Sequence, residues 1–352
     1  MDKGLCGLVN NSSFCYMNSS IQCLSNTVPF TLFFLNKEYL NFKNIQLDKF
    51  YLVENWFKLI EGLWQNNCVI SPISFLKSIF LISHENNYIF HNNQQQDACE
   101  FIIFLIEQLH NLLKIKINYI EKQEETKKEE KEEKEDKEEK KENYTIYKIA
   151  EKKWFETLNF NESIITTLFY GQYISIIETT DSLEKEISYS FEPFFPLQLN
   201  IPEKETPENN ITLELCLNDM ILENVLDGDN KWFNEKINQY VNAKKKILIF
   251  KSPSILMIQF KRFNYNNEKK NNLIEFPIDI LNFDKYLFYE KNVNYRLYAV
   301  INHFGNCNAG HYTNFCRNLN GKWYHYDDSN VMEIEKEDII TNKAYCLFYE
   351  KI

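Results

Sequence analysis

The chain has 352 residues, of which 44% are hydrophobic and 15% aromatic, so it can bury a large core and is not an intrinsically disordered protein. Its formal net charge of -11 disfavours nucleic acid and anionic membrane surfaces as partners and favours a basic partner. No stretch approaches the roughly 18 apolar residues that a membrane span needs.

Residues 1–120 are predicted to be mainly helical. Apolar residues recur at helical spacing from Cys15 to Val28, within 50–64 and within 94–113. For a further helix, Ser71 is the predicted N-cap and Pro72 the first helical residue.

A charged segment, residues 121–142, follows this helical part. It contains eight lysines and twelve acidic residues, and its only uncharged residues are Gln123 and Thr126. Because it has no apolar face, it cannot join a core, and we expect a disordered insertion. The alternative is a solvated single helix supported by Glu–Lys pairs four residues apart.

Residues 143–352 are predicted to be rich in strands. Runs of β-branched and aromatic residues, separated by Gly, Pro and Asn, occupy 168–180, 188–201, 245–265 and 295–306. Residues 311–329 predict a hairpin that turns at 318–321, and 344–351 predict a closing strand. Helices first and antiparallel strands second indicate an α+β fold, and the length fits one large domain or two ordinary ones.

The nine cysteines do not form a recognisable framework. Their number is odd, their spacings are irregular and no Cys-x-x-Cys pair occurs, which argues against a disulfide scaffold and against a thiolate zinc site. The first residues lack the apolar core of a signal peptide. We therefore expect a reducing compartment, the cytosol or the nucleus, and no metal or other cofactor.

Cys15 is the candidate nucleophile. It lies where a polar loop ends and a predicted helix begins, and a helix N-terminus stabilises the thiolate, which is a far better nucleophile than the thiol. A free cysteine is, however, most often a small buried hydrophobe. Position alone therefore leaves both interpretations open.

His311 is the candidate base, because a cysteine nucleophile needs a base and a residue that orients it. His311 begins the predicted hairpin, and Asp327 and Asp328 follow its second strand. A hairpin returns one strand beside the other, so either aspartate can fix the tautomer of His311. Taken alone, the two aspartates also fit an ordinary turn after a strand.

Asn10 is the candidate donor to an oxyanion. It precedes Cys15 by five residues and can offer its side-chain amide beside the backbone N–H of Cys15, or it can be a simple loop residue. The chain order Cys, His, Asp, with the cysteine on a helix and the others on later strands, is the papain-like arrangement. Together these signals favour a cysteine hydrolase.

Several ordered motifs resemble the ubiquitin-specific protease family. Its cysteine box, G-L-x-N-L-G-N-T-C-Y-M-N-S-x-x-Q-x-L, is matched by Gly7, Leu8, Asn10, Cys15-Tyr16-Met17-Asn18-Ser19, Gln22 and Leu24. Its Q-Q-D-A-x-E-F-L box is matched by Gln95-Gln96-Asp97-Ala98, Glu100 and Phe101. Its later motifs are matched by Lys261-Arg262-Phe263, His303, Gly310-His311-Tyr312, Trp323, Tyr326-Asp327-Asp328-Ser329 and Tyr345.

The resemblance, which runs from about Gly4 to Tyr349, implies a role for each candidate residue. It implies that Cys15 is the nucleophile, His311 the base and Asp327 the orienting residue, while Asp328 shares or takes over that role. Asn10 is similar to the oxyanion donor of the family.

The resemblance also implies the substrate and the fold. Gln96 and Asp97 resemble residues that hold the extended tail of ubiquitin, and Tyr312 resembles the aromatic residue beside the narrow diglycine channel. The family fold is a single catalytic domain, here 1–352, shaped like a hand, with a helical thumb (here 1–120) and a β-sheet palm and fingers (interleaved in 143–352). The expected partners are ubiquitin and its conjugates, and the expected state is a monomer.

The fingers are expected to lack the zinc that many family members bind there through two Cys-x-x-Cys pairs. The corresponding stretches, 179–182 and 231–236, contain no cysteine. Apolar packing is expected to hold the fingers instead, with contributions from Ile174, Ile176, Trp232 and Phe233.

One departure from the family keeps two alternatives open. Residues 11–14 are Asn-Ser-Ser-Phe, where the family has L-G-N-T, so a bulky Phe14 precedes Cys15. The alternatives are a catalytically silent ubiquitin-binding module and a protease for a ubiquitin-like modifier. The presence of Cys15, His311, Asp327 and Asn10 together favours the active deubiquitinase.

Overall fold

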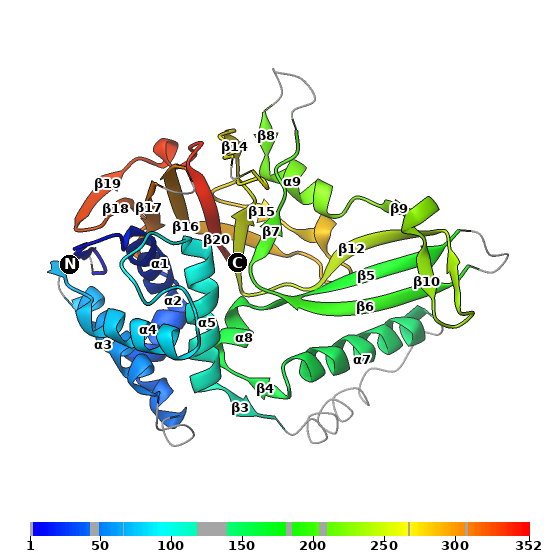
Figure 1. Cartoon of the computed structure of the whole chain (residues 1–352), viewed down its shortest axis with the longest axis horizontal. Coiled ribbons are helices and arrows are strands. Elements are labelled where there is room, and N and C mark those ends of the chain that lie inside the picture. The colour runs from blue at the N-terminus through cyan, green and yellow to red at the C-terminus, as the bar shows by residue number, and fades with distance from the viewer. Residues whose placement is uncertain are drawn as a thin grey trace.

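A computed structural model describes residues 3–42, 49–65, 67–117, 139–180, 185–203, 210–266, 268–306 and 309–352, with the backbone alone for 139–143. Figure 1 shows three parts: a helical region, a large central sheet and a second sheet that extends away from both. None of the described helices combines the length and apolar character needed to cross a membrane.

The helical region confirms the expectation for the N-terminal part of the chain. Its elements are α1 (Cys15–Ser25), α2 (Val28–Leu35), the 3-10 turn η1 (Glu38–Phe42), α3 (Tyr51–Gln65), α4 (Ile73–Glu85) and α5 (Ala98–Leu113). A short parallel pair, β1 (Gly7–Leu8) with β2 (Val69–Ile70), lies beside them. The apolar residues of α3 and α5 that set the predicted periodicity are buried.

Two predicted helix boundaries were wrong. The helix that begins at Cys15 stops at Ser25, and Val28 begins a new helix with Pro29 in its first turn. Proline lacks the N–H that a continuing helix needs, so it is tolerated only there. Helix α4 begins at Ile73 rather than Pro72, because Pro72 has a ψ of 29°, outside the helical range.

The central sheet has the strand order β19-β18-β17-β16-β20-β13-β7, and β15 also pairs with β16. Its strands are β7 (Leu197–Leu199), β13 (Ile255–Phe260), β15 (Leu281–Asn282), β16 (Asn294–Gly305), β17 (Gly310–Arg317), β18 (Trp323–Asp327), β19 (Asn330–Ile334) and β20 (Ala344–Lys351). The predicted hairpin is β17–β18, and the predicted closing strand is β20. Helices α1 and α5 share one hydrophobic core with a face of this sheet.

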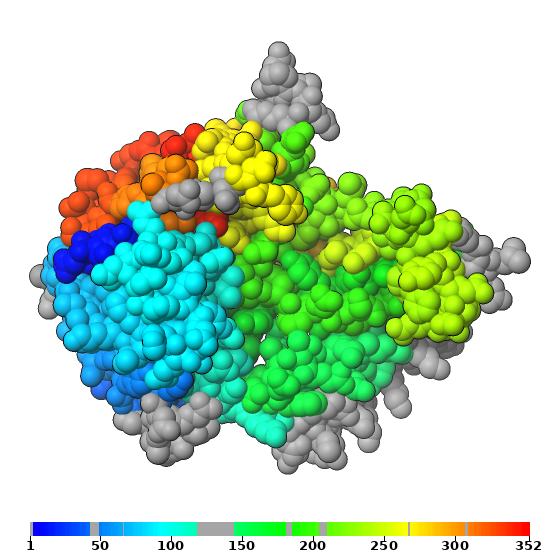
Figure 2. Space-filling view, viewed as in Figure 1, coloured from blue at the N-terminus to red at the C-terminus, as the bar shows by residue number. Residues whose placement is uncertain are grey.

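The second sheet has the order β6-β5-β12-β9, and a separate hairpin joins β10 to β11. Its strands are β5 (Gly171–Thr179), β6 (Ile187–Phe194), β9 (Asn224–Leu226), β10 (Trp232–Asn234), β11 (Gln239–Val241) and β12 (Ala243–Lys251). Two further pairs of short strands lie outside both large sheets: β3 (Ile115–Lys116) pairs with β4 (Asn161–Glu162), and β8 (Ile211–Thr212) pairs with β14 (Ile274–Glu275). The space-filling view shows the second sheet beside the helical region (Figure 2).

Helices α7 (Glu139–Thr157), α8 (Ile164–Phe169) and α9 (Leu213–Met220) were not predicted. Ile146 and Ala150 of α7 pack with Ile174 and Phe191 of the second sheet, so burial on the sheet stabilises a helix whose sequence is otherwise strongly polar. Residues 121–138 of the expected insertion lie outside the described residues. Its last four residues form the start of α7, which corrects the predicted boundary at 142.

Apolar packing in the second sheet matches the expectation only in part. Ile174 is buried and Ile176 packs against the same cluster. Phe233, however, is 39% exposed and contacts the ring of Tyr240 at 5.1 Å in the hairpin, and Trp232 is half-buried outside that cluster. The prediction is therefore confirmed for the two isoleucines, whereas Phe233 contributes packing only within the hairpin and Trp232 lies outside the cluster. The α+β fold itself is confirmed.

Candidate active site

Cys15 is the first residue of α1 and is almost completely buried. No side chain caps this helix end, where the first-turn N–H groups have no acceptor within the helix. Helix α1 packs against β17, the strand that carries His311. The fold therefore brings the start of the helix and the start of the strand together, as the papain-like chain order predicted.

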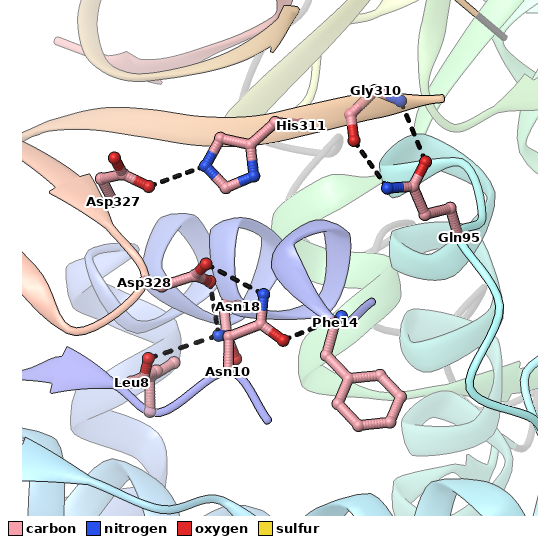
Figure 3. Close-up of polar contacts among 9 residues, drawn as sticks. All are labelled: Leu8, Asn10, Phe14, Asn18, Gln95, Gly310, His311, Asp327 and Asp328. Atoms are coloured by element: carbon pink, nitrogen blue, oxygen red, sulfur yellow. Dashed lines mark hydrogen bonds and ion pairs between the residues drawn. The ribbon is translucent and has the colours of Figure 1, made fainter. Parts of the chain in front are cut away.

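His311 and Asp327 are joined by a hydrogen bond of 2.7 Å between Nε2 and Oδ1 (Figure 3). The register of the hairpin explains it. Asn314 pairs with Tyr326, so Asp327 lies across from Thr313, which shares a face of the sheet with His311. The two side chains are thus diagonal neighbours on one face, within reach of each other.

The pKa of His311 is raised to about 9. The largest cause is a hydrogen bond with the Cys15 side chain, and the bond to Asp327 adds to it, while partial burial opposes both. Because Nε2 bonds to Asp327, Nδ1 is the ring nitrogen available to Cys15. The imidazole therefore lies between the thiol and the carboxylate and holds its proton at neutral pH.

Asp328 faces a different set of partners from its neighbour. Its backbone has a φ of 50°, the left-handed region that Asp tolerates in turns, and it begins the two-residue turn between β18 and β19. Its Oδ2 accepts from Nδ2 of Asn10 at 2.9 Å, and its Oδ1 accepts from Nδ2 of Asn18 at 2.7 Å. The adjacent aspartates thus serve separate groups, and Asp328 does not share the contact of Asp327 with His311.

Asn10 is held at both ends of its side-chain amide. Its Oδ1 accepts from the backbone N–H groups of Ser12 and Phe14, each at 3.2 Å, while its Nδ2 donates to Asp328 (Figure 3). These contacts fix which end of the amide faces the loop before Cys15. One of the two hydrogens on Nδ2 remains for a further acceptor.

The loop that departs from the family sequence is accommodated by packing. The Phe14 ring is 7% exposed and contacts Phe80 of α4, with a centroid separation of 5.7 Å. It therefore extends into the helical core. The backbone N–H of Phe14 donates to Oδ1 of Asn10, so the contact between the loop and Asn10 does not depend on the side chain at position 14.

A cleft of about 420 Å³ contains the three residues expected at the ubiquitin tail, Gln96, Asp97 and Tyr312. Its wall includes Gly310, which precedes His311, so the cleft adjoins the catalytic candidates. Gln95 connects the segment before α5 to the start of β17. Its Nε2 donates to the Gly310 carbonyl at 2.8 Å, and its Oε1 accepts from the Gly310 N–H at 2.9 Å.

The carboxylate of Asp97 binds three other residues that line this cleft. Its Oδ1 caps α5 by accepting from the backbone N–H of Glu100 at 2.9 Å. Its Oδ2 accepts from the hydroxyl of Tyr345 at 2.6 Å and from that of Tyr312 at 3.4 Å. These bonds tie the helical region to two strands of the central sheet and fix the width of the cleft.

His303 lies under the same wall. It is buried, and its ring contacts that of Tyr312 at a centroid distance of 4.6 Å, with the two planes tilted by 37°. Burial, assisted by nearby Lys269, lowers the pKa of His303 to about 4, so this histidine is neutral. A Cβ on Gly310 would collide with the His303 ring, which explains the glycine before His311.

Sequence reasoning missed Gln95 and Asn18 as site residues. Both lie inside the motifs that were matched, one position from Gln96 and three from Cys15, but neither spacing nor residue type indicated their partners. Within the described ranges, the one group that brings three possible metal ligands together is His311, Asp327 and Asp328, whose ligand atoms lie within 4.8 Å of one another. The expectation that the protein carries no zinc stays a prediction.

The family model described as "Ubiquitin carboxyl-terminal hydrolase" matches residues 6–349. The chain belongs to this family. It is 33% identical to ubiquitin carboxyl-terminal hydrolase 2 of Bos taurus over 99% of this chain and 55% of that protein. It is 31% identical to ubiquitin carboxyl-terminal hydrolase Usp2 of Drosophila melanogaster over 99% of this chain and 35% of that protein. The chain thus spans about half or less of the length of these curated relatives.

A solved structure of this family shares the fold. The SAGA DUB module of Ubp8 with Sgf11, Sus1 and Sgf73, bound to monoubiquitin, superposes with a TM-score of 0.73. The match has 25% sequence identity and covers 100% of this chain and 70% of that chain. The ubiquitin carboxyl-terminal hydrolase family and its hand-like fold were therefore correctly identified from the motifs.

Proposed function

We propose that this chain is a deubiquitinating thiol isopeptidase that hydrolyses the bond after the C-terminal Gly of ubiquitin. The observation that carries the proposal is the His311 ring between Cys15 and Asp327, next to the tail cleft. Membership of a family named for this reaction supports it, as does the bound monoubiquitin of the Ubp8 structure.

The mechanism follows from the contacts. His311, whose raised pKa keeps it protonated at neutral pH, pairs with the Cys15 thiolate. The thiolate attacks the carbonyl carbon of the terminal Gly, and the negative oxygen accepts hydrogen bonds from Asn10 and a backbone N–H at the start of α1. His311 then gives its proton to the leaving lysine amine, and an acyl-enzyme remains on Cys15.

Hydrolysis of the acyl-enzyme uses the same residues in reverse. His311, now neutral, accepts a proton from water, and the hydroxide attacks the thioester carbonyl. Collapse of this second intermediate expels the Cys15 thiolate and releases ubiquitin with a free carboxylate. Asp327 keeps Nε2 of His311 protonated and oriented throughout, and Asp328 holds the donor amide of Asn10.

Gln96, Asp97 and Tyr312 are proposed to bind the extended tail of ubiquitin in the cleft. The bonds of Asp97 to Tyr345 and to the start of α5 support a rigid, preformed channel. The net charge of -11 suits the basic surface of a ubiquitin molecule. The proposed partners are ubiquitin and its conjugates, for a chain that acts as a monomer.

The cytosol or the nucleus is the proposed compartment. The nine cysteines are odd in number, irregularly spaced and without a Cys-x-x-Cys pair, which supports a reducing environment. The proposal also has a redox consequence, since a thiolate nucleophile is inactivated by oxidation where thiols are not kept reduced.

The silent-module alternative loses its main support in the packing of Phe14. The altered residues 11–14 were the reason for this alternative, and Phe14, the bulkiest of them, is buried against Phe80. A protease for a ubiquitin-like modifier uses the same thiol, base and oxyanion donor, so only the tail and the surface of the modifier distinguish it from the main proposal.

One experiment separates the three functions: incubation with ubiquitin that carries a thiol-reactive group at its C-terminus. We expect a covalent adduct on Cys15, found by peptide mapping, and none on a Cys15→Ala variant that still binds ubiquitin. Binding without an adduct would support the silent module. Neither binding nor adduct, together with an adduct to a ubiquitin-like modifier carrying the same group, would support the second alternative.

A further inference from the structure

Two cysteines that are distant in sequence lie in contact at the parallel pair β1–β2. The Sγ atoms of Cys6 and Cys68 are 3.9 Å apart, and the backbone N–H of Cys68 donates to Cys6 Sγ at 3.3 Å. Neither residue is in a disulfide. The contact lies apart from Cys15 and takes no part in the proposed mechanism.

The pairing of β1 with β2 places the backbones of Cys6 and Cys68 side by side. Gly7 pairs with Val69, so Cys6 and Cys68 are the residues immediately before one register position, and the Gly7 N–H donates to the Cys68 carbonyl at 3.0 Å. Adjacent strands lie about 4.8 Å apart. Disulfides span Cα separations of about 4.4–6.8 Å, and the usual spacing of paired strands falls within that range.

Access to solvent distinguishes this pair from the other close thiols. Cys68 is exposed, whereas the other seven described cysteines are buried. Cys23 contacts Cys316, and Cys99 contacts Cys346, but all four are fully enclosed in the core. A small oxidant can therefore reach Cys68 and no other described thiol that has a cysteine neighbour.

We propose that Cys6 and Cys68 form a reversible disulfide by exchange with a low-molecular-weight disulfide of the glutathione class. The Cys68 thiolate attacks one sulfur of the small disulfide, forms a mixed disulfide and expels one small thiolate. The Cys6 thiolate then attacks the Cys68 sulfur and expels the second. Two protein thiols are oxidised by two electrons, the small disulfide is reduced to two thiols, and the protons of Cys6 and Cys68 pass to them.

The order of attack follows from the burial of the two residues. Burial raises the pKa of Cys6 to about 11, so Cys6 is a poor first nucleophile. Once Cys68 carries a small thiol, its sulfur lies next to Cys6, and the second step is intramolecular. Cys68 is thus the residue that reacts first, and Cys6 is the residue that resolves the mixed disulfide.

The crosslink would act close to the proposed oxyanion loop. Two residues after Cys6, the N–H of Leu8 donates to the Asp328 carbonyl at 2.8 Å, and the Leu8 carbonyl accepts from Asn18 at 3.4 Å. A disulfide would tie β1, which makes these contacts, to β2. It would also close the long loop between the two cysteines and reduce the entropy of the unfolded chain.

The test is equilibration of the purified wild-type protein with excess glutathione disulfide, followed by thiol blocking, non-reducing digestion and mass spectrometry. We expect a Cys6–Cys68 linked peptide that excess reduced glutathione removes, and a Tm several degrees higher in the oxidised protein. Recovery of Cys68 as free thiol, as a persistent mixed disulfide or paired with another cysteine would overturn the proposal.

Matched variants make the test specific. Cys68→Ser should abolish the linked peptide and the rise in Tm, and Cys6→Ser should stop the reaction at the mixed disulfide on Cys68. Cys216→Ser, which removes a buried thiol elsewhere in the core, should keep both effects. Cys15→Ala should also keep both; loss of the crosslink in that variant would show that the active-site thiol mediates it and would overturn the direct exchange.

Discussion

The carboxylate of Asp328 accepts a hydrogen bond of 2.9 Å from the side-chain amide of Asn10. The other oxygen of this carboxylate accepts a hydrogen bond from the side-chain amide of Asn18, so each oxygen binds one amide (Figure 3). Asp328 therefore acts on the proposed oxyanion donor, while its neighbour Asp327 acts on His311. Adjacent residues of one turn thus orient the donor and the base independently.

The first prediction concerns this link between Asn10 and Asp328. Asn10→Ala should lower kcat by about 10²–10³, the usual effect of removing one oxyanion donor, with little change in KM. Asp328→Asn should lower kcat in the same direction, because the amide of Asn10 loses its charged acceptor. The double variant should be little worse than Asn10→Ala alone, because both changes remove one function.

Steady-state kinetics with ubiquitin that carries a fluorogenic amide at its C-terminus measure this effect. Asn36→Ala, at an exposed position outside the site, is the control and should leave kcat unchanged. Fully additive losses in the double variant would show that Asp328 acts on something other than Asn10. The prediction that Asp327→Ala costs more activity than Asp328→Ala is checked in the same assay.

The second prediction concerns pH. The pKa of His311 is raised to about 9, so its proton, which the leaving amine needs, is present below that pH and lost above it. The alkaline limb of kcat/KM should therefore fall with a midpoint near 9. Asp327 contributes to the raised pKa, so Asp327→Asn should move this midpoint down towards the ordinary value of about 6.5.

Asp328→Asn is the matched control for the pH profile. It should lower activity through Asn10 and move the alkaline midpoint much less than Asp327→Asn does, because Asp328 bonds to Asn10 and Asn18 and not to His311. If the alkaline midpoint of Asp327→Asn were the same as that of the wild type, a group other than His311 would set the alkaline limb.

The sequence allowed the fold class and the meeting of His311 with Asp327 to be predicted, because periodicity and hairpin pairing are local. The turn at 318–321 brings one end of the hairpin back to the other, and His311 and Asp327 meet as a result. The choice between Asp327 and Asp328 could not be made from the local sequence. It depends on the left-handed backbone of Asp328 and on two asparagines from a distant part of the chain.

Helix α7 illustrates what the sequence could not reveal. Its mixture of charged and aromatic residues has a weak helical pattern, and its stability depends on packing Ile146 and Ala150 against the second sheet. Gln95 is a similar case for the site, since its partner Gly310 lies 215 residues later. Tertiary contacts decide both, and local propensity does not encode them.

The third prediction concerns Asn18, which is buried and donates to Asp328 at 2.7 Å. Asn18→Ala should reduce the free energy of unfolding by about 1–3 kcal/mol, because a carboxylate oxygen of Asp328 loses its partner in a partly buried site. It should also lower kcat with little effect on KM. Urea denaturation and steady-state kinetics measure the two effects.

Asn18→Asp sharpens the test because it keeps the size of the side chain and changes its charge. A carboxylate at this position faces Asp328 directly, so we expect a larger loss of stability at pH 7 than for Asn18→Ala. Equal stability of the two variants at pH 7 would contradict the proposed contact.

The fourth prediction concerns metal. The two stretches where many family members bind zinc contain no cysteine, and a structural zinc site needs four ligands, usually thiolates or imidazoles. Elemental analysis of the purified protein should find no stoichiometric zinc, and a chelator should change neither Tm nor activity. About one zinc per chain, lost together with stability on chelation, would refute this.

The fifth prediction separates Gln95 from its neighbour Gln96. Gln95 makes two hydrogen bonds to Gly310, the residue before His311, so it positions the strand end that carries the base. Gln96 lines the cleft where the ubiquitin tail is proposed to bind. Gln95→Ala should therefore lower kcat, by about tenfold if the two bonds together contribute about 1.4 kcal/mol. Gln96→Ala should chiefly raise KM.

Gln95→Glu provides the conservative comparison. It keeps an acceptor for the Gly310 N–H but replaces the donor to the Gly310 carbonyl with a negatively charged oxygen, which the carbonyl repels. Its kcat should therefore be no higher than that of Gln95→Ala, although the side chain is nearly the same size. If both Gln95 variants changed KM alone, Gln95 would be a tail-binding residue, and the strand end of β17 would hold His311 without it.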